Sequence, residues 1–327
     1  MEVGKIPNNI LNKLILENIK NKRSEILIRP AIGEDCTAID LDGKICVLST
    51  DPVTGAANNI GKLAVHISCN DVASSGAEPI GILITILAPP SAEISDFQLI
   101  MKQAAEVCDK LNVEILGGHT EITSAVNRFV LSSTVIGKTI KDKLVLTSGA
   151  QAGDDIIMTK WAGLEGTAII AADMENELGK TVGTDIVKKA KGFINHISVV
   201  KEGMLAGEFG VNSMHDITEG GVLGAVWEVL RSSGKGGIIY KDKIPVKEET
   251  SKICEHFNID PFRLISSGSM LITCKKGAEL IEILKKNNIE ASIIGIVNEG
   301  NEIKLKDGDD FIKISQPGSD ELYKVIK

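Results

Sequence analysis

Residues 61–79 read GKLAVHISCNDVASSGAEP and place an acidic residue, Asp71, among the apolar and small residues of its central part, which include Ala64, Val65, Ile67, Cys69, Val72 and Ala73. The pattern predicts a helix over 58–75 that is rich in small residues. A carboxylate buried in such a helix is costly unless it is paired or ligates a cation. The stretch therefore predicts a helix with a functional acid, unless Asp71 simply lies on a polar face of that helix.

Apolar runs on both sides of this helix predict a first half in which strands and helices alternate. The predicted strands are Ile45–Thr50, Ile80–Leu87, Glu114–Leu116 and Phe129–Ile136. An amphipathic helix precedes them, with apolar residues at Ile10, Leu11, Leu14, Ile15 and Ile19. A helix of about 16 residues begins near Ser95, where Ser95 and Gln98 match a capping box. Its predicted buried stripe is Phe97, Met101, Ala104, Cys108 and Leu111.

The second half repeats this style. The predicted strands are Ile156–Thr159, Met270–Cys274 and Ala291–Val297, and the predicted helices include Val222–Leu230 and Ala278–Asn287. A Gly-rich polar segment, 147–154, is the best candidate for a boundary. A length of 327 residues also favours two domains. We place them at 1–142 and 143–327, as two α+β domains that meet at a cleft.

Charge and composition disfavour several classes of partner. The chain has 36 Lys and Arg against 44 Asp and Glu, and the resulting net charge of −8 repels nucleic-acid phosphates and acidic membranes. An aromatic content of 3% leaves few platforms for base stacking. No secretory signal and no apolar run of roughly 18 residues is found, so no membrane span is expected. Six cysteines without a CxxC pair indicate reduced, mostly buried thiols in a cytoplasmic protein.

Three short segments of the first half each place an acid beside small residues at the end of an element. They contain Asp35 (GEDC, 33–36), Asp51 (STDP, 49–52) and Asp71 (NDVA, 70–73). Three carboxylates that converge in a cleft suit magnesium, which takes oxygen ligands and keeps waters for substrate phosphate. Each acid also has an ordinary explanation, as a turn residue, a strand-end cap or part of a polar helix face.

Two glycine-rich segments give a second signal. GGHTE (117–121) follows a predicted strand, and DITEGG (216–221) precedes a predicted helix. Glycines at a helix start let backbone N–H groups approach an anion, although each segment could be an ordinary tight turn. Among the five histidines, we expect only His119 to face a cleft. His215-Asp216 suggests a metal pair, but no HxxxH or HxxE spacing places two ligands on one helix face.

Six motifs, taken in order, resemble the aminoimidazole ribonucleotide (AIR) synthase superfamily. They are GEDCTAID (33–40), STDPV (49–53), GKLAVHISCNDVASSGAEP (61–79), GGHTE (117–121), HDITEGGVLGAVWEV (215–229) and ISSGSML (265–271). The resemblance spans nearly the whole chain. Within the superfamily, the second helix and the DITEGG segment look most like the hydrogenase maturation branch, HypE.

This resemblance implies a four-stranded N-terminal sheet that forms a barrel with its copy in a homodimer, and a C-terminal α+β domain that covers the site. It implies ATP and Mg²⁺ as cofactors. Asp35, Asp51 and Asp71 match the acidic positions around the metal. The positions that match the nucleotide site are Gly33, Lys62, Asn70, Gly117, Gly118, Thr120, Asp216, Gly220 and Gly221. Lys62 could instead be a solvated charge on a helix surface.

The sequence also departs from its nearest relatives. Members of the hydrogenase maturation branch end in a Cys whose thiolate carries a carbamoyl group, whereas this sequence ends GSDELYKVIK. They have acid-Thr-Lys where this chain has His119-Thr120-Glu121, and Asn-Glu-Gly where it has Ser266-Ser267-Gly268. The reactive N-terminal Cys of selenophosphate synthetases is missing, and His119 replaces the acid of the thiamine-monophosphate kinase GGDT motif. We therefore expect an acceptor that is not carried on the protein's own tail.

The leading hypothesis is phosphoryl transfer from ATP to the oxygen of a free small molecule, or activation of that oxygen for dehydration. Magnesium and the glycine-rich loops hold the triphosphate, and His119 or Glu121 acts as the base. One alternative is a nucleotide-binding regulatory or partner protein that kept the fold without catalysis. Another is a thiamine-monophosphate kinase-like activity. The sequence does not identify the acceptor.

Overall fold

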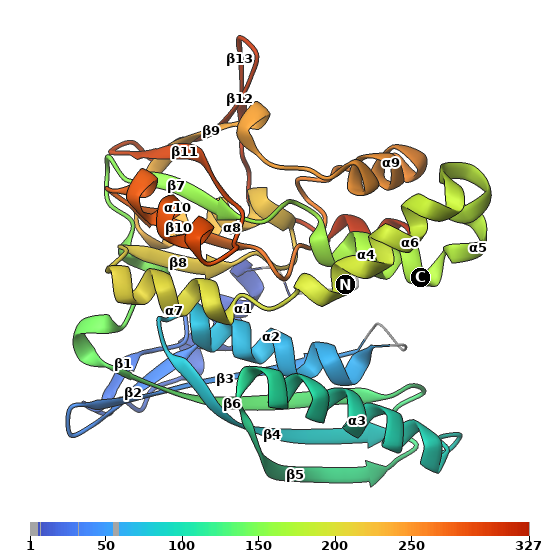
Figure 1. Ribbon diagram of the computed structural model, residues 1–327. Coiled ribbons are helices and arrows are strands. Elements are labelled where there is room, and N and C mark those ends of the chain that lie inside the picture. The colour runs from blue at the N-terminus through green and yellow to red at the C-terminus, as the bar shows by residue number, and fades with distance from the viewer. Residues whose placement is uncertain (1–5, 7, 32, 55–58, 327) are drawn as a thin grey trace.

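The computed structural model describes residues 6, 8–31, 33–54 and 59–326. It contains two sheets, one from each half of the chain, with helix α2 (Ile60–Ser74) and helix α3 (Ile94–Leu111) between the first sheet and the second half (Figure 1). None of the described helices has the length and apolar character of a membrane-spanning segment.

The first sheet has the order β1-β2-β3-β6-β4-β5, so the described chain builds six strands where four were expected. Four strands are long, namely β3 (Lys44–Val53), β4 (Glu78–Ala88), β5 (Glu114–Ile122) and β6 (Val130–Ile140). Two short strands, β1 (Ile26–Ile28) and β2 (Thr37–Leu41), extend the sheet at the β3 edge. β4 and β5 are parallel and the other pairs are antiparallel.

Helix α2 packs on the inner face of this sheet, against β3 and β6. Most of its residues are buried. The prediction of a helix here is confirmed, with Asp71 2% exposed; position 58 lies outside the described residues. The opposite, outer face of the sheet carries exposed apolar residues, among them Ile80, Leu83 and Leu116. Successive residues of a strand alternate between these two faces.

Two local predictions need correction. The capping box of α3 is formed by Glu93 and Asp96 rather than by Ser95 and Gln98. Met101 is 37% exposed instead of buried, because the helix turns Ile100, Ala104 and Cys108 towards the core. The N-terminal segment forms a helix, α1 (Asn8–Leu14), and a 3-10 turn (Leu16–Asn18), but three of its apolar residues stay exposed, namely Leu14, Ile15 and Ile19.

The second sheet has seven strands in the order β13-β12-β9-β11-β7-β10-β8. They are β7 (Asp155–Thr159), β8 (Ser213–Asp216), β9 (Gly236–Tyr240), β10 (Met270–Cys274), β11 (Ala291–Asn298), β12 (Ile303–Asp307) and β13 (Asp310–Lys313). The helices of this half are α4 (Leu164–Asp173), α5 (Glu175–Leu178), α6 (Thr184–Gly192), α7 (Val200–Phe209), α8 (Gly221–Ser232), α9 (Glu248–Phe257) and α10 (Gly277–Lys286). The predicted strand Met270–Cys274 is confirmed residue for residue.

Asn70 joins the two halves of the molecule. Its side-chain amide donates to the carbonyl of Ile197 at 2.8 Å, and its Oδ1 accepts from the N–H of Val199 at 2.8 Å. The residue is fully buried, so both polar ends of its side chain are satisfied by backbone of the second half. Asn70 was predicted to contact a nucleotide; in this structure it holds α2 against the segment that leads into α7.

Candidate functional site

Four carboxylates from separate parts of the chain converge where α2 meets the second half. Asp35 follows the GEDC glycine, Asp51 lies near the end of β3, Asp71 lies on α2, and Asp216 is the last residue of β8. Burial raises the pKa of Asp71 well above its usual range, and the charges of Asp216, Asp51 and Asp35 raise it further. The three acids predicted as metal ligands are therefore brought together, and Asp216, which was predicted for the nucleotide site, lies with them.

The Asp71 carboxylate is held in place from the inner face of β3. Ser49 Oγ donates to Asp71 Oδ2 at 2.5 Å, and Asp51 shares a side-chain hydrogen bond with Asp71. Two carboxyl groups can share a hydrogen bond only when a proton lies between them. In the protein without a cation, Asp71 is thus expected to keep a proton at pH values where an ordinary Asp is ionised.

A cavity of about 240 Å³ opens beside Asp35. It is lined by Pro30, Glu34, Asp35, Cys36, Thr37, Leu48, Ser49, Thr50 and Thr134. Burial and the neighbouring charge of Asp35 raise the pKa of Glu34. The cavity is smaller than the roughly 300–1,000 Å³ of ordinary small-molecule sites. It offers hydroxyl and carboxyl groups rather than an aromatic lining.

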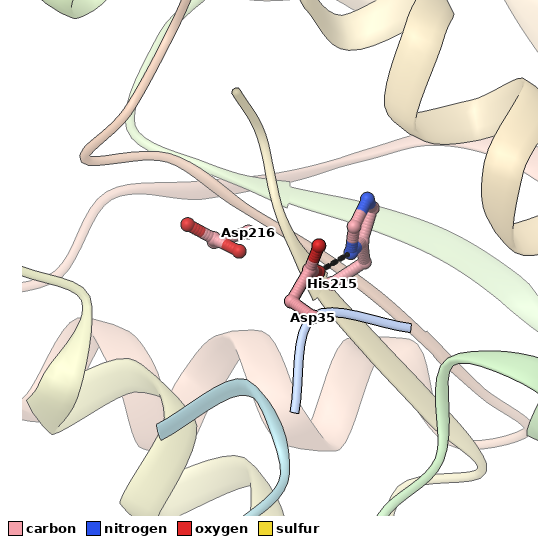
Figure 2. A group of neighbouring side chains, drawn as sticks. All are labelled: Asp35, His215 and Asp216. Carbon is pink, nitrogen blue, oxygen red and sulfur yellow. Dashed lines mark ion pairs between the residues drawn. The ribbon is translucent and has the colours of Figure 1, made fainter. Parts of the chain in front are cut away.

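His215 is the main residue of this region whose place in the site was not predicted. It lies on β8, is 2% exposed, and is bracketed by two acids: Nδ1 is 2.7 Å from Asp35 Oδ2 and Nε2 is 3.0 Å from Glu228 Oε2. Burial opposes its charged form, but the two carboxylates outweigh burial and raise the pKa of His215 well above its usual range. Figure 2 shows the imidazole and Asp35 pointing towards each other, with Asp216 beside them.

Glu165 is a second residue that was not predicted. It lies in the first turn of α4, is 3% exposed, and hydrogen-bonds to Ser267. Burial is the main cause that raises its pKa to about 7. Its signal in the sequence is the same as that of Asp71: an acid in a helix made mostly of apolar and small residues. At Ser267 the hydrogenase maturation pattern has a Glu, so here a carboxyl group reaches this position from another element.

The GGHTE segment lies away from the acidic cluster. It forms part of strand β5 instead of a loop. In the sheet order β5 is three strands away from β3, which corresponds to about 14 Å because neighbouring strands lie about 4.8 Å apart. His119 pairs with Thr85 of β4, and both side chains lie on the outer face of the sheet, whereas Asp71 lies on its inner side. His119 and Glu121 contact each other at 3.4 Å and are exposed. Within one chain, the structure does not bring these predicted bases to the acidic cluster.

Gly118 of this strand and both glycines of DITEGG have steric explanations, whereas a Cβ on Gly117 would meet only the Leu83 side chain at 3.9 Å. A Cβ on Gly118 would lie 1.8 Å from the carbonyl oxygen of Ile84, so the pairing of β4 and β5 itself requires glycine. The N–H of Gly220 donates to Asp320 Oδ2 at 2.7 Å, and the N–H of Gly221 donates to the Thr218 carbonyl at 3.1 Å. The amides that were predicted to bind phosphate therefore have acceptors within the protein.

The other residues that were predicted to contact the nucleotide do not form one cluster. Gly33 has a φ of +81°, and a Cβ there would lie 2.8 Å from Ser232 Oγ, so this glycine lets the GEDC loop approach α8. Lys62 is half-buried in the first turn of α2, nine residues or roughly 14 Å along the helix axis from Asp71. Thr120 and Gly117 lie on β5 with Gly118. Of these residues, Asp216 lies beside Asp35, and Gly33 is two positions from Asp35 in the chain.

Sequence profiles of known families match both halves of the chain. Residues 33–139 match the family described as AIR synthase related protein, N-terminal domain. Residues 151–308 match AIR synthase related protein, C-terminal domain.

Three curated relatives illustrate the sequence similarity. A putative hydrogenase expression/formation protein of Methanocaldococcus jannaschii is 27% identical over 301 residues, covering 89% of this chain and 88% of the relative. The carbamoyl dehydratase HypE of Bradyrhizobium diazoefficiens is 26% identical over 74% of this chain and 70% of its own length. A thiamine-monophosphate kinase of Pyrococcus horikoshii is 25% identical over 89% of this chain and 91% of its own length.

Solved structures show the same two-domain fold. A HypE–HypF complex chain superimposes with a TM-score of 0.79 at 24% identity, covering 94% of this chain and 99% of that chain. A hydrogenase maturation protein HypE in complex with ATP gives a TM-score of 0.71 at 19% identity, with coverages of 99% and 97%. AaThiL complexed with AMPPCP and TMP gives 0.71 at 20% identity, with coverages of 95% and 99%.

Asp71→Asn should change how stability depends on pH in the absence of divalent cations. A carboxyl group whose pKa is raised in the folded state binds its proton more tightly there than in the unfolded chain. The contribution of Asp71 to the free energy of unfolding is fully present below the pKa of the unfolded chain, near 3.8. It is lost as pH rises through the raised pKa of the folded state. Relative to Asp71→Asn, the wild type should therefore lose stability as pH rises from 4 towards 8. The expected loss is about 1.4 kcal/mol per pH unit wherever only the folded protein keeps the Asp71 proton.

Thermal unfolding with a chelator, at several pH values, measures this difference. Asp310→Asn changes an exposed carboxylate on β13 and serves as the matched control, because its curve should run parallel to that of the wild type. A parallel curve for Asp71→Asn would show that Asp71 is ionised in the folded protein.

Proposed function

The chain belongs to the AIR synthase related family, and we propose that it is an ATP- and Mg²⁺-dependent enzyme that transfers phosphate to, or activates for dehydration, an oxygen of a small molecule. In this proposal residues 1–142 form the nucleotide-binding and dimerising domain, and residues 143–327 form the domain that covers it. The observation that carries the proposal is that Asp35, Asp51 and Asp216 all lie close enough to the buried Asp71 for their charges to raise its pKa.

These acids fit a magnesium site by their chemistry. Four carboxylates that face one another repel unless a proton or a cation lies among them. Oxygen donors are the ligands that Mg²⁺ prefers, and it keeps some waters and substrate phosphate oxygens in its shell. When bound, Mg²⁺ would neutralise charge on the triphosphate. Asp35, Asp51 and Asp71 would hold the ion, and Ser49 would orient Asp71 through its 2.5 Å hydrogen bond.

ATP is proposed on the support of related proteins. A hydrogenase maturation protein HypE has been solved with ATP, and AaThiL with the ATP analogue AMPPCP. In this chain, Gly33 lies two residues before Asp35, Asp216 belongs to the cluster, and Lys62 lies further along α2. The role of such residues in phosphoryl transfer is to position the reactants and to balance charge, so no covalent step on the protein is required.

The cysteines support a free acceptor instead of one carried on a thiol. A carrier thiol must ionise to react. Burial raises the pKa of all six cysteines, to about 11 for Cys108 and Cys274 and about 12 for Cys254, and further for Cys36 and Cys69. None of the six is disulfide-bonded, which also favours the cytoplasm as the compartment.

A homodimer would complete the site. The outer face of the first sheet presents Ile80, Leu83 and Leu116 at 39–50% exposure, and the cavity beside Asp35 is bordered by Leu48 and Thr50 of the same sheet. Exposed apolar sheet faces mark interaction surfaces. A second copy packed on this face could bring its own His119 and Glu121, which lie on the outer side of β5, towards the cavity. The predicted bases would then act between chains.

The dimer is testable by mass. Light scattering should give about 70 kDa, twice the 34.9 kDa of one chain. The double variant Leu83→Asp/Leu116→Asp should reduce this to the mass of a monomer, because two charges would be buried in the interface. The matched control, Ile94→Asp/Leu99→Asp, changes two exposed apolar residues on α3, outside the proposed interface, and should stay dimeric. A monomeric wild type would remove this part of the proposal.

Nucleotide binding is the first test of the activity. Isothermal titration with ATP and Mg²⁺ should show binding to the wild type, and Asp71→Asn should weaken it at least about tenfold, because one charged ligand of the cation is lost. Asp310→Asn should bind as the wild type does. Undiminished binding to Asp71→Asn, or no binding to the wild type, would contradict the proposed site.

Turnover distinguishes the enzyme from two alternatives. The similarity to a thiamine-monophosphate kinase favours that substrate as the second candidate. ADP release in the presence of thiamine monophosphate would support the kinase activity, and release only with another small acceptor would support the wider proposal. ATP that is bound but never consumed, across a broad panel of metabolites, would indicate a regulatory or partner protein without catalysis.

A further inference from the structure

We propose that the hairpin formed by β12 and β13 binds an extended acidic segment of a partner protein, which adds one more strand to the second sheet beside β13. The inference goes beyond the proposed function, since it requires neither a nucleotide nor an acceptor and uses no residue of the acidic cluster. Figure 1 shows the hairpin projecting from the second half, at the end of the molecule away from the first sheet. It therefore lies away from the face on which the homodimer is proposed to form.

Helices cover one face of the second sheet only in part. Ile296 of β11 is in register with Asp155 of β7, and Asp155 Oδ2 accepts from the N–H of Gly277 in α10 at 3.2 Å, so α10 packs on the face to which Ile296 belongs. Residues in register lie on the same face of a sheet, and this face continues over β9, β12 and β13, where its residues are at least partly exposed. We call this part the open face, and it carries Tyr240, Ile296, Lys304, Lys306, Phe311 and Lys313.

Large apolar side chains are exposed on both sides of β13. On the open face, Phe311 is 53% exposed and Ile296 is 38% exposed. On the opposite face Ile312 is 51% exposed, although Leu305, its neighbour in register on β12, is 6% exposed. The packing of that face therefore ends at β12, and β13 lies beyond it with an exposed apolar residue on each of its faces. Exposed apolar side chains that lie together mark interaction surfaces.

The charge of the open face favours an acidic partner. Lys304 and Lys313 lie directly opposite each other on β12 and β13, an arrangement of like charges that destabilises a strand pair. Glu302 forms an ion pair with Lys304 at 2.5 Å, whereas no residue in the described part of the chain forms a salt bridge with Lys306 or Lys313. This local excess of positive charge stands out in a chain whose net charge is −8. Carboxylates of a partner would offset it, whereas a second copy of the hairpin would bring like charges together.

The unpaired edge of β13 favours an extended partner. β13 is the last strand in the sheet order, so only one of its two edges is paired within the described chain. In an antiparallel pair, alternate residues direct their backbone N–H and C=O groups away from the neighbouring strand, where an added strand can bind them. The fitting partner strand has an acidic residue opposite Lys313, apolar residues opposite Ile312 and Phe311, and a neutral residue opposite Asp310.

A fluorescein-labelled peptide with the sequence Glu-Glu-Val-Leu-Thr-Glu follows this pattern for an antiparallel strand and serves as the probe. Fluorescence polarisation with the full-length protein should give a Kd below about 1 mM. The double variant Lys306→Glu/Lys313→Glu should weaken binding at least about tenfold, because attraction becomes repulsion. Lys285→Glu/Lys286→Glu makes the same change of charge at exposed residues of α10, so this matched control should bind as the wild type does.

Hydrogen–deuterium exchange tests the added strand without a variant. The peptide should slow amide exchange in residues 310–314 of the wild type. A peptide of the same sequence with N-methylated backbone amides should bind at least about tenfold more weakly, because it keeps the side chains but loses the backbone donors.

Four results would overturn the inference. Binding that is absent at about 1 mM peptide, or that the control variant weakens equally, would leave β13 as a short charged edge that only prevents aggregation. Binding of an oligothymidylate in place of the peptide would assign the open face to nucleic acid. A light-scattering mass that Phe311→Ser halves would assign it to a second copy of this chain. None of these measurements contains ATP or Mg²⁺, so failure of the proposed function would not affect them.

Discussion

The repulsion among carboxylates that surround a buried Asp71 is the constraint on which the rest of this structure depends. Asp71 lies on a helix that is buried on almost every side, and Asp35, Asp51 and Asp216 raise its pKa further. The fold places these charges together at the junction of two domains, where a cation or a proton must offset them. A protein with no use for a cation would gain stability from an uncharged residue at position 71.

The same junction is where the two domains are held together. Asn70 binds backbone of the second half, and His215 pairs with Asp35 of the first half. Both contacts are polar and involve a buried side chain, so separating the domains would expose or orphan these groups. The geometry of the acidic cluster is thus tied to domain docking, because Asp216 reaches the other acids only when the second half is in place.

Within the AIR synthase related family, this chain departs from the hydrogenase maturation pattern at positions that the sequence resemblance connects with the acceptor. His119 and Ser267 differ from that pattern, and Glu165 hydrogen-bonds to Ser267 with a pKa of about 7. The acids that suit a magnesium-bound triphosphate are kept, whereas the residues expected to meet the acceptor are changed. This combination agrees with the proposal of an ATP-dependent enzyme that acts on a different substrate.

The amino-acid sequence alone determined the buried helix around Asp71, the alternation of strands and helices, and the four clustered acids, of which Asp35, Asp51 and Asp71 were predicted as metal ligands and Asp216 as part of the nucleotide site. These features are local: a periodic pattern fixes which side of an element is buried, and a charged residue within it is visible as an exception. Glu165 carries the same signal and could have been found in the same way. The two short strands at the sheet edge carry too few residues for a pattern to show.

Only the tertiary structure decided which distant residues meet. It placed His215 between Asp35 and Glu228, gave the amide of Gly220 to Asp320, and assigned Asn70 to domain contact. It also put His119 on the outer face of the sheet, on a strand where the sequence indicated a loop. The physical reason is that such contacts depend on how the sheets and helices pack in three dimensions, and residues more than a hundred positions apart leave no periodic trace of their pairing.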